Sequence, residues 1–586
     1  LFTLSLDAVS NMPCNPSIGG TGKGHLVFEI DALGGEMGYA ADLVTMQSRT
    51  LNTSKGAAVR SKRVQADRRK YSAVMKQTIE NTPNLRLIQA EVTSLVTETD
   101  GNGKIRVIGV NTEPCGEFEC KAVVISTGTY LGGATYVGDV KRRSGPDNSL
   151  PAEGLNDSLR NLGFELYRFK TGTPPRIHRR SIDFDVLDLQ EGEDYITPFS
   201  SRTDEKRLNS IDQVPCHIVY TNENTHNIIR ENIHRSPLYS GKIHGTGPRY
   251  CPSIEDKVVR FADKNRHQVF IEPEGLFTNE MYVGGMSSSL PEDVQYAMYR
   301  TVPGLENVRI VRNAYAIEYD CINSRQLKAT LEFKAISGLF SGGQFNGSSG
   351  YEEAAVQGFM AGVNAAMKVL GREPFVLDRS QAYIGVLIDD LVTKENHEPY
   401  RMMTSRAEYR LLLRQDNADL RLRAIGHEIG LVSDAEYEKV LKKERDIEEE
   451  IERLEHTNVG STEEVQTFLE SHGSTPLKSG ASLAELIKRP ELDYFMLTKL
   501  DKNRPELPED TQEQVNINLK YEGYIRRQKQ QVAQFKKLEK RKLDVNFDYS
   551  EVKGLRKEAI QKLNLFKPMS IGQASRISGV SPADIS

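Results

Sequence analysis

The chain has 586 residues and a mass of 65.7 kDa, which exceeds one ordinary domain and predicts three or four. Hydrophobic residues make up 38% and charged residues 27%, so a buried core is expected and wholesale disorder is excluded. The formal net charge of -5 excludes a uniformly basic nucleic-acid binder, but not local basic patches. Six scattered cysteines without a CxxC pair argue against a disulfide scaffold and favour a reducing, cytoplasmic setting. No apolar run approaches the roughly 20 residues of a membrane span.

Up to about residue 130, short strands alternate with helices. The opening residues 1–6 alternate apolar and polar side chains and predict a strand that is already under way. A glycine-rich loop follows over 14–25. The pattern then predicts a helix over 62–81 and strands over 85–89, 105–111 and 122–129. The last strand ends in a tight glycine turn, the kind of junction at which open α/β sheets bind ligands. We therefore expect a Rossmann-like α/β domain.

The pattern changes after this domain. A surface loop is predicted over 138–154, and many short strands between about 165 and 300 indicate an inserted β-rich domain. The α/β pattern returns with a strand at 308–311, and the chain is nearly all helical from 373. The expected domains are 1–166 and 305–372 for a discontinuous α/β domain, 167–304 for the insertion, and 373–586 for the helical part.

The segment 338–370 carries the strongest cofactor signal. A strand ends at Gly342 and Gly343, Gln344 follows, and a helix rich in small residues is predicted over 351–370. Such a helix packs closely on a sheet, and its amino end offers N–H groups to a phosphate or a flavin edge. A purely structural close packing is the alternative. The GxGxxG opening is absent, because the cluster at 19–24 fits neither it nor a Walker A loop, so an FAD phosphate turn is expected upstream of Leu1.

Two of the six cysteines are candidates for chemistry. Cys14 lies in an Asn-Pro and glycine loop near Lys23 and His25, and Cys251 lies in a loop beside Arg249. A nearby cation favours the reactive thiolate, although a free cysteine is more often an inert small hydrophobic residue. The other four are expected to be structural, with no metal site: Cys115 and Cys120 in a hairpin, Cys216 and Cys321 in strands.

Basic residues gather in three places. They occur over 55–70 and over 401–423, where arginine alternates with tyrosine and suits phosphates and unstacked RNA bases. Ion pairing with neighbouring acids is the alternative. In the helical part, residues 434–455 include ten acidic and five basic side chains, whereas residues 520–542 include nine basic and two acidic ones. The second helix is either a solvated surface helix or a surface for nucleic acid or an acidic partner.

Six segments resemble one family from end to end of the chain, the MnmG (GidA) family of FAD-dependent tRNA uridine 5-carboxymethylaminomethyl modification enzymes. The matching segments are Asn11–His25, Gly247–Lys257, Tyr351–Ala355, Glu398–Met402, Thr404–Arg410 and Ser570–Val580. The resemblance implies that the chain acts on the wobble uridine of tRNA together with the GTPase MnmE. It also implies a homodimer that forms a complex with two copies of each protein. The carbon would come from methylenetetrahydrofolate, the nitrogen from glycine or ammonium, and the reducing equivalents from NADH.

The resemblance also implies site residues. The two functional cysteines of the family fall on Cys14 and Cys251. The FAD contacts, besides Gly342 and Gly343, fall on Val92, Ala152 and Gln344, where Ala152 replaces a common serine. The NAD stretch runs over 247–261, with Gly247, Pro248, Arg249, Tyr250, Ser253 and Phe261 as its expected binding residues.

The chemistry gives both cysteines a role, since uracil C5 becomes nucleophilic only after a thiolate adds to C6, and a second group must then remove the C5 proton. We expect Cys251 to add and Cys14 to assist proton transfer. The rival functions are a folate- and FAD-dependent tRNA uracil-C5 methyltransferase, a non-catalytic tRNA-binding scaffold and a flavin thiol-disulfide reductase. The long helical extension argues against the first, and the missing CxxC argues against the last.

Overall fold

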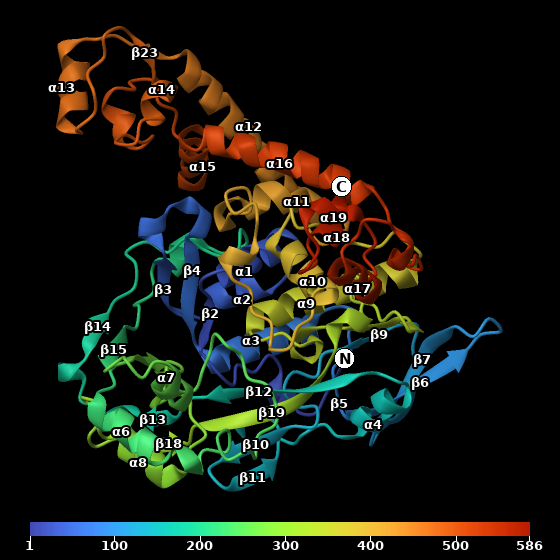
Figure 1. Cartoon of the computed structure of the whole chain (residues 1–586). Helices are drawn as coiled ribbons and strands as arrows, with labels where there is room; N and C mark the ends of the chain where they lie inside the picture. Colours follow the sequence, from blue (N-terminus) through green and yellow to red (C-terminus); the bar gives the residue numbers. More distant parts are fainter.

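The structure is a computed structural model that describes residues 1–586 (Figure 1). Its largest hydrophobic core has 52 buried residues, which come from residues 12–199 and 322–422. The chain before the insertion and the chain after it therefore fold together, and this core also includes Phe199 of the predicted insertion and residues from 375 to 422 of the predicted helical part. A second core lies between 177 and 308, and a third between 447 and 519.

Parallel strand pairs join distant parts of the chain in the first unit. β9 pairs with β21, β7 with β20, and β1 with β5, each in parallel. These strands span Phe2–Thr3 (β1), Ile88–Gln89 (β5), Ile105–Glu113 (β7), Val123–Ile125 (β9), Ile336–Ser337 (β20) and Leu339–Ser341 (β21). The helix α9, Tyr351–Leu370, packs on β9 and β21, as the periodicity of small residues predicts, and its neighbour α1, Lys23–Ala32, packs against it. The α/β fold class is confirmed.

The first 81 residues differ from the prediction in three respects. The opening strand is only two residues long. The glycine-rich loop contains a short strand, β2 (Ser17–Gly19), and the start of α1 after Gly22, whose φ of 76° is left-handed. The predicted helix over 62–81 begins at Arg68, because Asp67 caps it by accepting the Lys70 N–H at 3.0 Å. Residues Ser61–Ala66 instead form β4, the centre of a three-stranded sheet with β2 and β3, Thr45–Leu51.

The insertion is β-rich, as predicted, but it extends past residue 304, because the strand predicted at 308–311 to begin the second α/β segment is an edge strand of the insertion sheet. Its sheet has six antiparallel strands in the order β14-β15-β16-β17-β13-β18. They span Arg176–His178 (β13), Asp188–Gln190 (β14), Cys216–Tyr220 (β15), Gln268–Pro273 (β16), Glu280–Gly284 (β17) and Ile310–Arg312 (β18). The helices α6 (Glu223–Glu231), α7 (Ile254–Arg260) and α8 (Glu292–Tyr299) lie beside it (Figure 1).

A four-stranded antiparallel sheet joins the insertion to the α/β unit. Its order is β11-β10-β19-β12, with β10 at Ala134–Val137, β11 at Val140–Arg143, β12 at Leu166–Thr173 and β19 at Tyr315–Ile322. The predicted surface loop over 138–154 is therefore wrong in part. It contributes β11, and its Ser144 and Pro146 are buried against the sheet rather than exposed.

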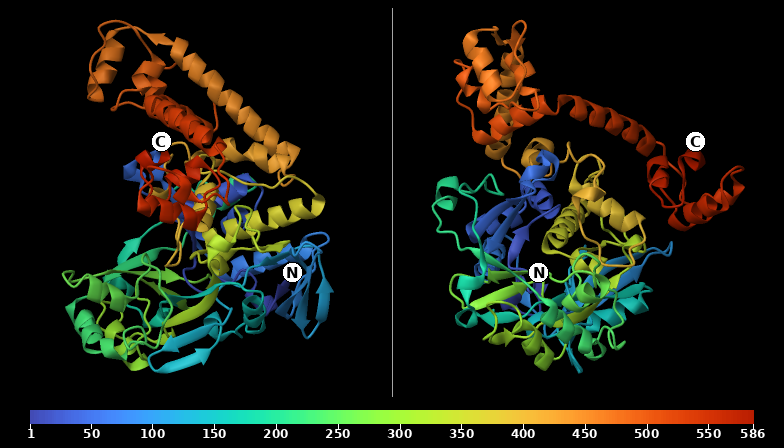
Figure 2. Two further views of the ribbon diagram at one scale, coloured as in Figure 1. Left: turned by 45° about the vertical axis from the view of Figure 1, so that its right-hand side comes forward. Right: turned by 60° about the vertical axis from the view of Figure 1, so that its left-hand side comes forward.

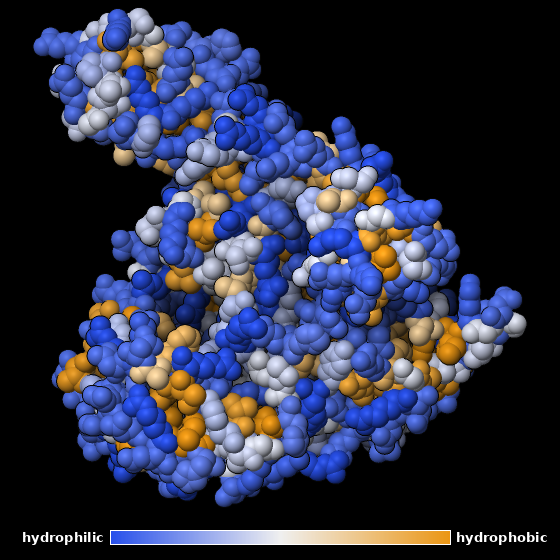
Figure 3. Space-filling model, viewed as in Figure 1, coloured by the Kyte–Doolittle hydropathy of each residue, from blue (hydrophilic) through white to orange (hydrophobic).

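The carboxyl-terminal part is helical, as predicted. An arm of α12 (Asp434–His456), α13 (Glu463–Ser471), α14 (Leu483–Ile487) and α15 (Glu509–Lys520) stands away from the α/β unit (Figure 1). The long helix α16, Glu522–Lys540, runs from this arm to a small terminal bundle of α17 (Lys557–Phe566), α18 (Ile571–Ser575) and α19 (Pro582–Ile585), as Figure 2 shows. The face in Figure 3 is mostly hydrophilic, with scattered apolar groups. No helix combines the length and the apolar character that a bilayer crossing requires.

Candidate functional site

Two glycine turns lie at one edge of the parallel pair β9–β21. The N–H of Gly342, directly after β21, donates to the carbonyl of Ile125 at the end of β9 at 2.9 Å. The turn Ser126-Thr-Gly128 continues from β9 at the same edge, and the hydroxyl of Thr127 is buried there without a hydrogen-bond partner. An unpaired buried hydroxyl is costly, so this edge fits a ligand that presents a polar atom to it.

The turn after β21 packs closely against α9. A Cβ added to Gly342 would lie 2.9 Å from the Gly358 nitrogen, so no side chain fits between the turn and the helix. Gly343 and Gly350 have left-handed φ angles of 77° and 124°. The first turn of α9 holds Glu352, paired with Lys23 at 2.8 Å. A phosphate would meet that carboxylate, so the amino end of α9 suits a ring edge better than a phosphate.

The other predicted FAD residues lie on segments that are connected to the chain at this edge. The Ala152 N–H donates to the carbonyl of Tyr130, four residues after Ser126, at 2.9 Å. Val92 belongs to β6, Glu91–Thr99, and the Glu91 carboxylate accepts the N–H of Glu153 at 2.9 Å, which holds the two segments together. Gln344 is partly exposed in the turn that packs on β19.

Cys14 is held from three sides. Its N–H donates to the Tyr351 hydroxyl at the start of α9 at 2.8 Å. Its sulfur lies 3.1 Å from the Tyr282 hydroxyl on β17 and 3.8 Å from the Gly172 carbonyl on β12. Burial raises the pKa of the thiol, and the charge of nearby Cys251 adds to that shift, whereas Tyr282 and Arg176 lower the pKa. The net shift is upward, so Cys14 is a neutral thiol near neutral pH.

The expected cations beside Cys14 are occupied elsewhere. Lys23 pairs with Glu352, and His25 is fully buried, where burial and the charge of Arg421 lower its pKa to about 3. The cation that does reach Cys14 is Arg176, which donates to the Pro13 carbonyl at 2.8 Å. Sequence reasoning missed it because 162 residues separate the two, and the contact exists only after the insertion has folded.

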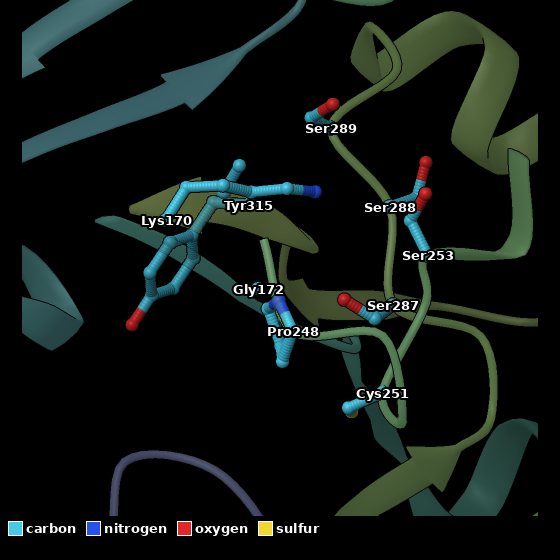
Figure 4. A pocket seen from close by; sticks show the side chains of 10 residues that line it. Lys170, Gly172, Pro248, Cys251, Ser253, Ser287, Ser288, Ser289 and Tyr315 are labelled. Carbon is cyan, nitrogen blue, oxygen red and sulfur yellow. The ribbon is translucent and has the colours of Figure 1, made fainter. Parts of the chain in front are cut away.

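Cys251 is exposed and opens onto a pocket between the insertion and the joining sheet (Figure 4). Ten residues line it: Lys170, Gly172, Pro248, Cys251, Ser253, Ser287, Ser288, Ser289, Tyr315 and Ala316. Cys14 does not line this pocket, but its sulfur is near the carbonyl of Gly172, which does, and it is close enough to Cys251 to feel its charge. Predicted catalytic residues far apart in the sequence are thus close in space.

The segment 247–261 is only partly at this pocket. Pro248 and Ser253 line it, and Ser253 also caps α7 by accepting the Asp256 N–H at 3.2 Å. Gly247 lies against Lys170, where an added Cβ would come within 2.4 Å of the lysine Cε. Phe261, in contrast, directly follows the carboxyl end of α7 and does not line the pocket.

Two further residues of this segment face elsewhere. Tyr250 is 44% exposed. Arg249, the expected cation beside Cys251, pairs with Glu398 at 3.3 Å. Lys257 is the cation near Cys251, and it donates to the Gly285 carbonyl at 2.9 Å. Burial lowers the pKa of Lys257, and the charge of Cys251 partly opposes that shift.

Most arginines of the two basic stretches near the core are ion-paired, as the structural alternative predicts, whereas Lys55, Arg69 and Lys70 are exposed and have no ion pair. Arg68 pairs with Asp147 and Glu274, and Arg414 with Asp416. Most of these guanidinium groups are therefore unavailable to a phosphate. The basic face of α16 is different, since Arg526, Arg527 and Lys529 are exposed.

Comparison with known proteins identifies the chain's relatives. The family described as "Glucose inhibited division protein A" matches residues 1–373. Two families described as the "tRNA modifying enzyme MnmG/GidA C-terminal helical domain" and the "tRNA modifying enzyme MnmG/GidA C-terminal helical bundle" match residues 434–529 and 531–586.

The similarity extends over the whole chain. Proteins named "tRNA uridine 5-carboxymethylaminomethyl modification enzyme MnmG" from Lachnoclostridium phytofermentans and Caldicellulosiruptor saccharolyticus are 62% and 61% identical over all of this chain and 92% of their own length. The solved structure of GidA from Aquifex aeolicus, 46% identical, superposes with a TM-score of 0.89 and covers all of this chain and 92% of that one. The chain therefore belongs to the MnmG (GidA) family.

Proposed function

We propose that the chain is an FAD-dependent enzyme that adds a carboxymethylaminomethyl or aminomethyl group to C5 of the wobble uridine of tRNA. Membership of the MnmG family supports a tRNA uridine substrate. The observation that carries the chemistry is that Cys251 lines a pocket together with Gly172, whose carbonyl lies 3.8 Å from the Cys14 sulfur. A pyrimidine bound there would lie near the Cys251 sulfur for addition and near the Cys14 sulfur for proton transfer.

The exposed Cys251 is the nucleophile of the proposal. Its thiolate adds to uracil C6, the new C–S bond forms, and the C5–C6 π electrons move onto C5 and O4 as an enolate. C5 then attacks an electrophilic one-carbon unit that originates from methylenetetrahydrofolate. The wobble base lies in a single-stranded loop, so it reaches such a pocket without opening a duplex.

Cys14 completes the cycle in this proposal. The C5 proton must leave before the Cys251 thiolate can be expelled and the C5–C6 double bond restored. Cys14 first releases its own proton to water and then takes the proton from C5, so it needs neighbours that stabilise its thiolate. Tyr282 and Arg176 both lower its pKa in this way.

The cofactors are part of the proposal. FAD would lie at the β9–β21 edge, held by Val92, Ala152, Gly342, Gly343 and Gln344, and the unpaired Thr127 hydroxyl supports a ligand there. When bound, FAD supplies the redox chemistry that side chains cannot perform. NADH would approach along 247–261, of which Pro248 and Ser253 line the pocket.

The proposed partners follow the family resemblance. We infer tRNA binding by the basic face of α16, assembly with the GTPase MnmE, and a homodimer. The exposed bases Arg526, Arg527 and Lys529 support the first of these. Six free cysteines support a reducing, cytoplasmic environment.

The test is nucleoside mass spectrometry of tRNA from cells that lack the protein. We expect the wobble-uridine side chain to disappear, to return with the wild-type chain or with Cys115→Ser, and to stay absent with Cys14→Ser or Cys251→Ser. Cys115 is the matched control because it is exposed in a remote hairpin turn. Loss of a C5-methyl group instead would favour the methyltransferase, and a colourless protein that takes up no FAD would favour the scaffold.

The assignment of the two cysteines has its own experiment. A tRNA containing 5-fluorouracil lacks the C5 proton, so the adduct with the attacking sulfur should accumulate. It should form with Cys14→Ser and be missing with Cys251→Ser. The reverse pattern would exchange the two roles.

A further inference from the structure

Tyr282 and Arg176 form a buried cluster beside the Cys14 sulfur, and the two-cysteine chemistry alone does not require it. Tyr282 on β17 and Arg176 on β13 are direct cross-strand partners in the insertion sheet. The tyrosine hydroxyl lies 3.1 Å from the Cys14 sulfur, and the guanidinium lies over the tyrosine ring at 5.0 Å from its centroid. Both side chains are almost fully buried, at 2% and 1% exposed.

Arg176 also forms hydrogen bonds with the loop that contains Cys14. It donates to the Pro13 carbonyl at 2.8 Å and to the Cys14 carbonyl at 3.4 Å. Its Nε donates to Glu274 at 2.6 Å, which holds the guanidinium plane against the ring. One cation therefore touches the backbone of the cysteine and the ring of the tyrosine that meets its sulfur.

A second arginine extends this support. Arg68 shares Glu274 with Arg176 and donates to the Asn11 side chain at 2.9 Å, three residues before Cys14. The loop from Asn11 to Cys14 is thus held at both ends by buried arginines that meet on one carboxylate. Such an ion network fixes geometry, since breaking any pair leaves a buried charge without a partner.

We propose that Tyr282 and Arg176 are positioning residues that make a thiolate attainable at Cys14, Tyr282 by donating its hydroxyl to the sulfur and Arg176 by holding tyrosine and loop together. This inference rests on the proposed function and deepens it, because a proton acceptor at Cys14 must exist as a thiolate in its buried place. A hydrogen bond to the charged form and a nearby positive charge both favour that form against burial.

The other groups around Cys14 either disfavour its thiolate or do not contact the sulfur. The Tyr351 hydroxyl accepts from the Cys14 N–H, so it orients the backbone. The charge of nearby Cys251 disfavours a second negative charge at Cys14. The remaining charged and titratable groups near the loop are Arg68, Tyr130, Asp147, Glu274 and Tyr315. Tyr282 is the only side chain of this set whose hydroxyl forms a hydrogen bond with the sulfur.

The test measures alkylation of Cys14 against pH, read by mass spectrometry of the Cys14 peptide from the full-length protein with iodoacetamide as the probe. Loss of a hydrogen bond to a charged group corresponds to roughly a tenfold to hundredfold smaller thiolate fraction. With Tyr282→Phe we therefore expect alkylation at neutral pH to slow by roughly that factor and the pH profile to move upward. The phenylalanine keeps the ring over Arg176. Exposed Cys115 serves as internal control, with an unchanged rate.

Arg176→Lys provides the second variant, because it keeps the positive charge but loses the planar fork that holds Pro13 and Glu274. We expect a smaller upward movement of the same profile, and this variant decides the question if Tyr282→Phe does not fold. A Cys14 profile that superimposes on the wild type in a folded variant overturns the inference. The alkylation needs no tRNA, so a wild-type protein that fails to modify tRNA while the Cys14 profile still moves would refute the proposed function and leave this inference standing.

Discussion

The contact between Gly342 and α9 predicts that one methyl group will disrupt the β9–β21 edge. In Gly342→Ala, the new Cβ would lie 2.9 Å from the Gly358 nitrogen, 3.0 Å from the Gln357 carbonyl carbon and 3.1 Å from the Gly358 Cα. All three are backbone atoms of one helix, so no side-chain rotation relieves the overlap. Either the turn or α9 must shift.

The magnitude follows from overpacking of a tight interior. Such insertions cost about 1–3 kcal/mol, and in a cooperative unit of about 150–250 residues each kcal/mol lowers the melting temperature by about 2–4 °C. We expect a melting temperature several degrees lower. Because the turn carries Gly343 and Gln344 to the proposed FAD edge, we also expect weaker flavin retention.

The matched control is Gly362→Ala on the same helix. That position is exposed, and an added Cβ would meet nothing within 4 Å. Alanine is favoured over glycine inside a helix by about 1 kcal/mol, so this variant should melt at the same temperature or higher. Scanning calorimetry and the flavin absorbance of the purified proteins measure both effects. Equal melting temperatures and equal flavin content for Gly342→Ala and wild type would refute the close-packing argument.

Three further predictions address stability, pH and tRNA binding. Glu274→Gln leaves Arg68 and Arg176 short of a buried carboxylate and should lower the urea midpoint, at a cost of about 3–5 kcal/mol; an unchanged midpoint would contradict the network. In the folded protein His25 has a pKa of about 3 and stays neutral, whereas in the unfolded chain it takes up a proton near pH 6.5. The free energy of unfolding should therefore fall by about 1.4 kcal/mol for each pH unit between about 6.5 and 3. His25→Phe should remove that part of the acid dependence in urea titrations at pH 5 and 7. Arg526→Ala should weaken tRNA binding and flatten its salt dependence in filter-binding assays, whereas Lys442→Ala on the acidic helix α12 should not.

Local patterns were sufficient for the elements that small residues and periodicity define. The helix over 351–370 and the strand before it follow from the run of small residues after the glycine turn, and the structure confirms both. The helix predicted over 62–81 was wrong in its first six residues, because pairing with β2 and β3 overrides their helical appearance. Strand pairing depends on partners elsewhere in the chain, and no local pattern contains it.

The sequence by itself determined the fold class, the two candidate cysteines and, through long specific motifs, the family. Only the tertiary structure decided what surrounds each sulfur: Cys14 meets Tyr282 and Arg176, more than 150 residues away, rather than the neighbouring Lys23 and His25. The physical reason is that burial and the charges within a few ångströms set the state of a thiol, and folding brings those charges from distant segments while ion pairs and the core remove the nearby ones.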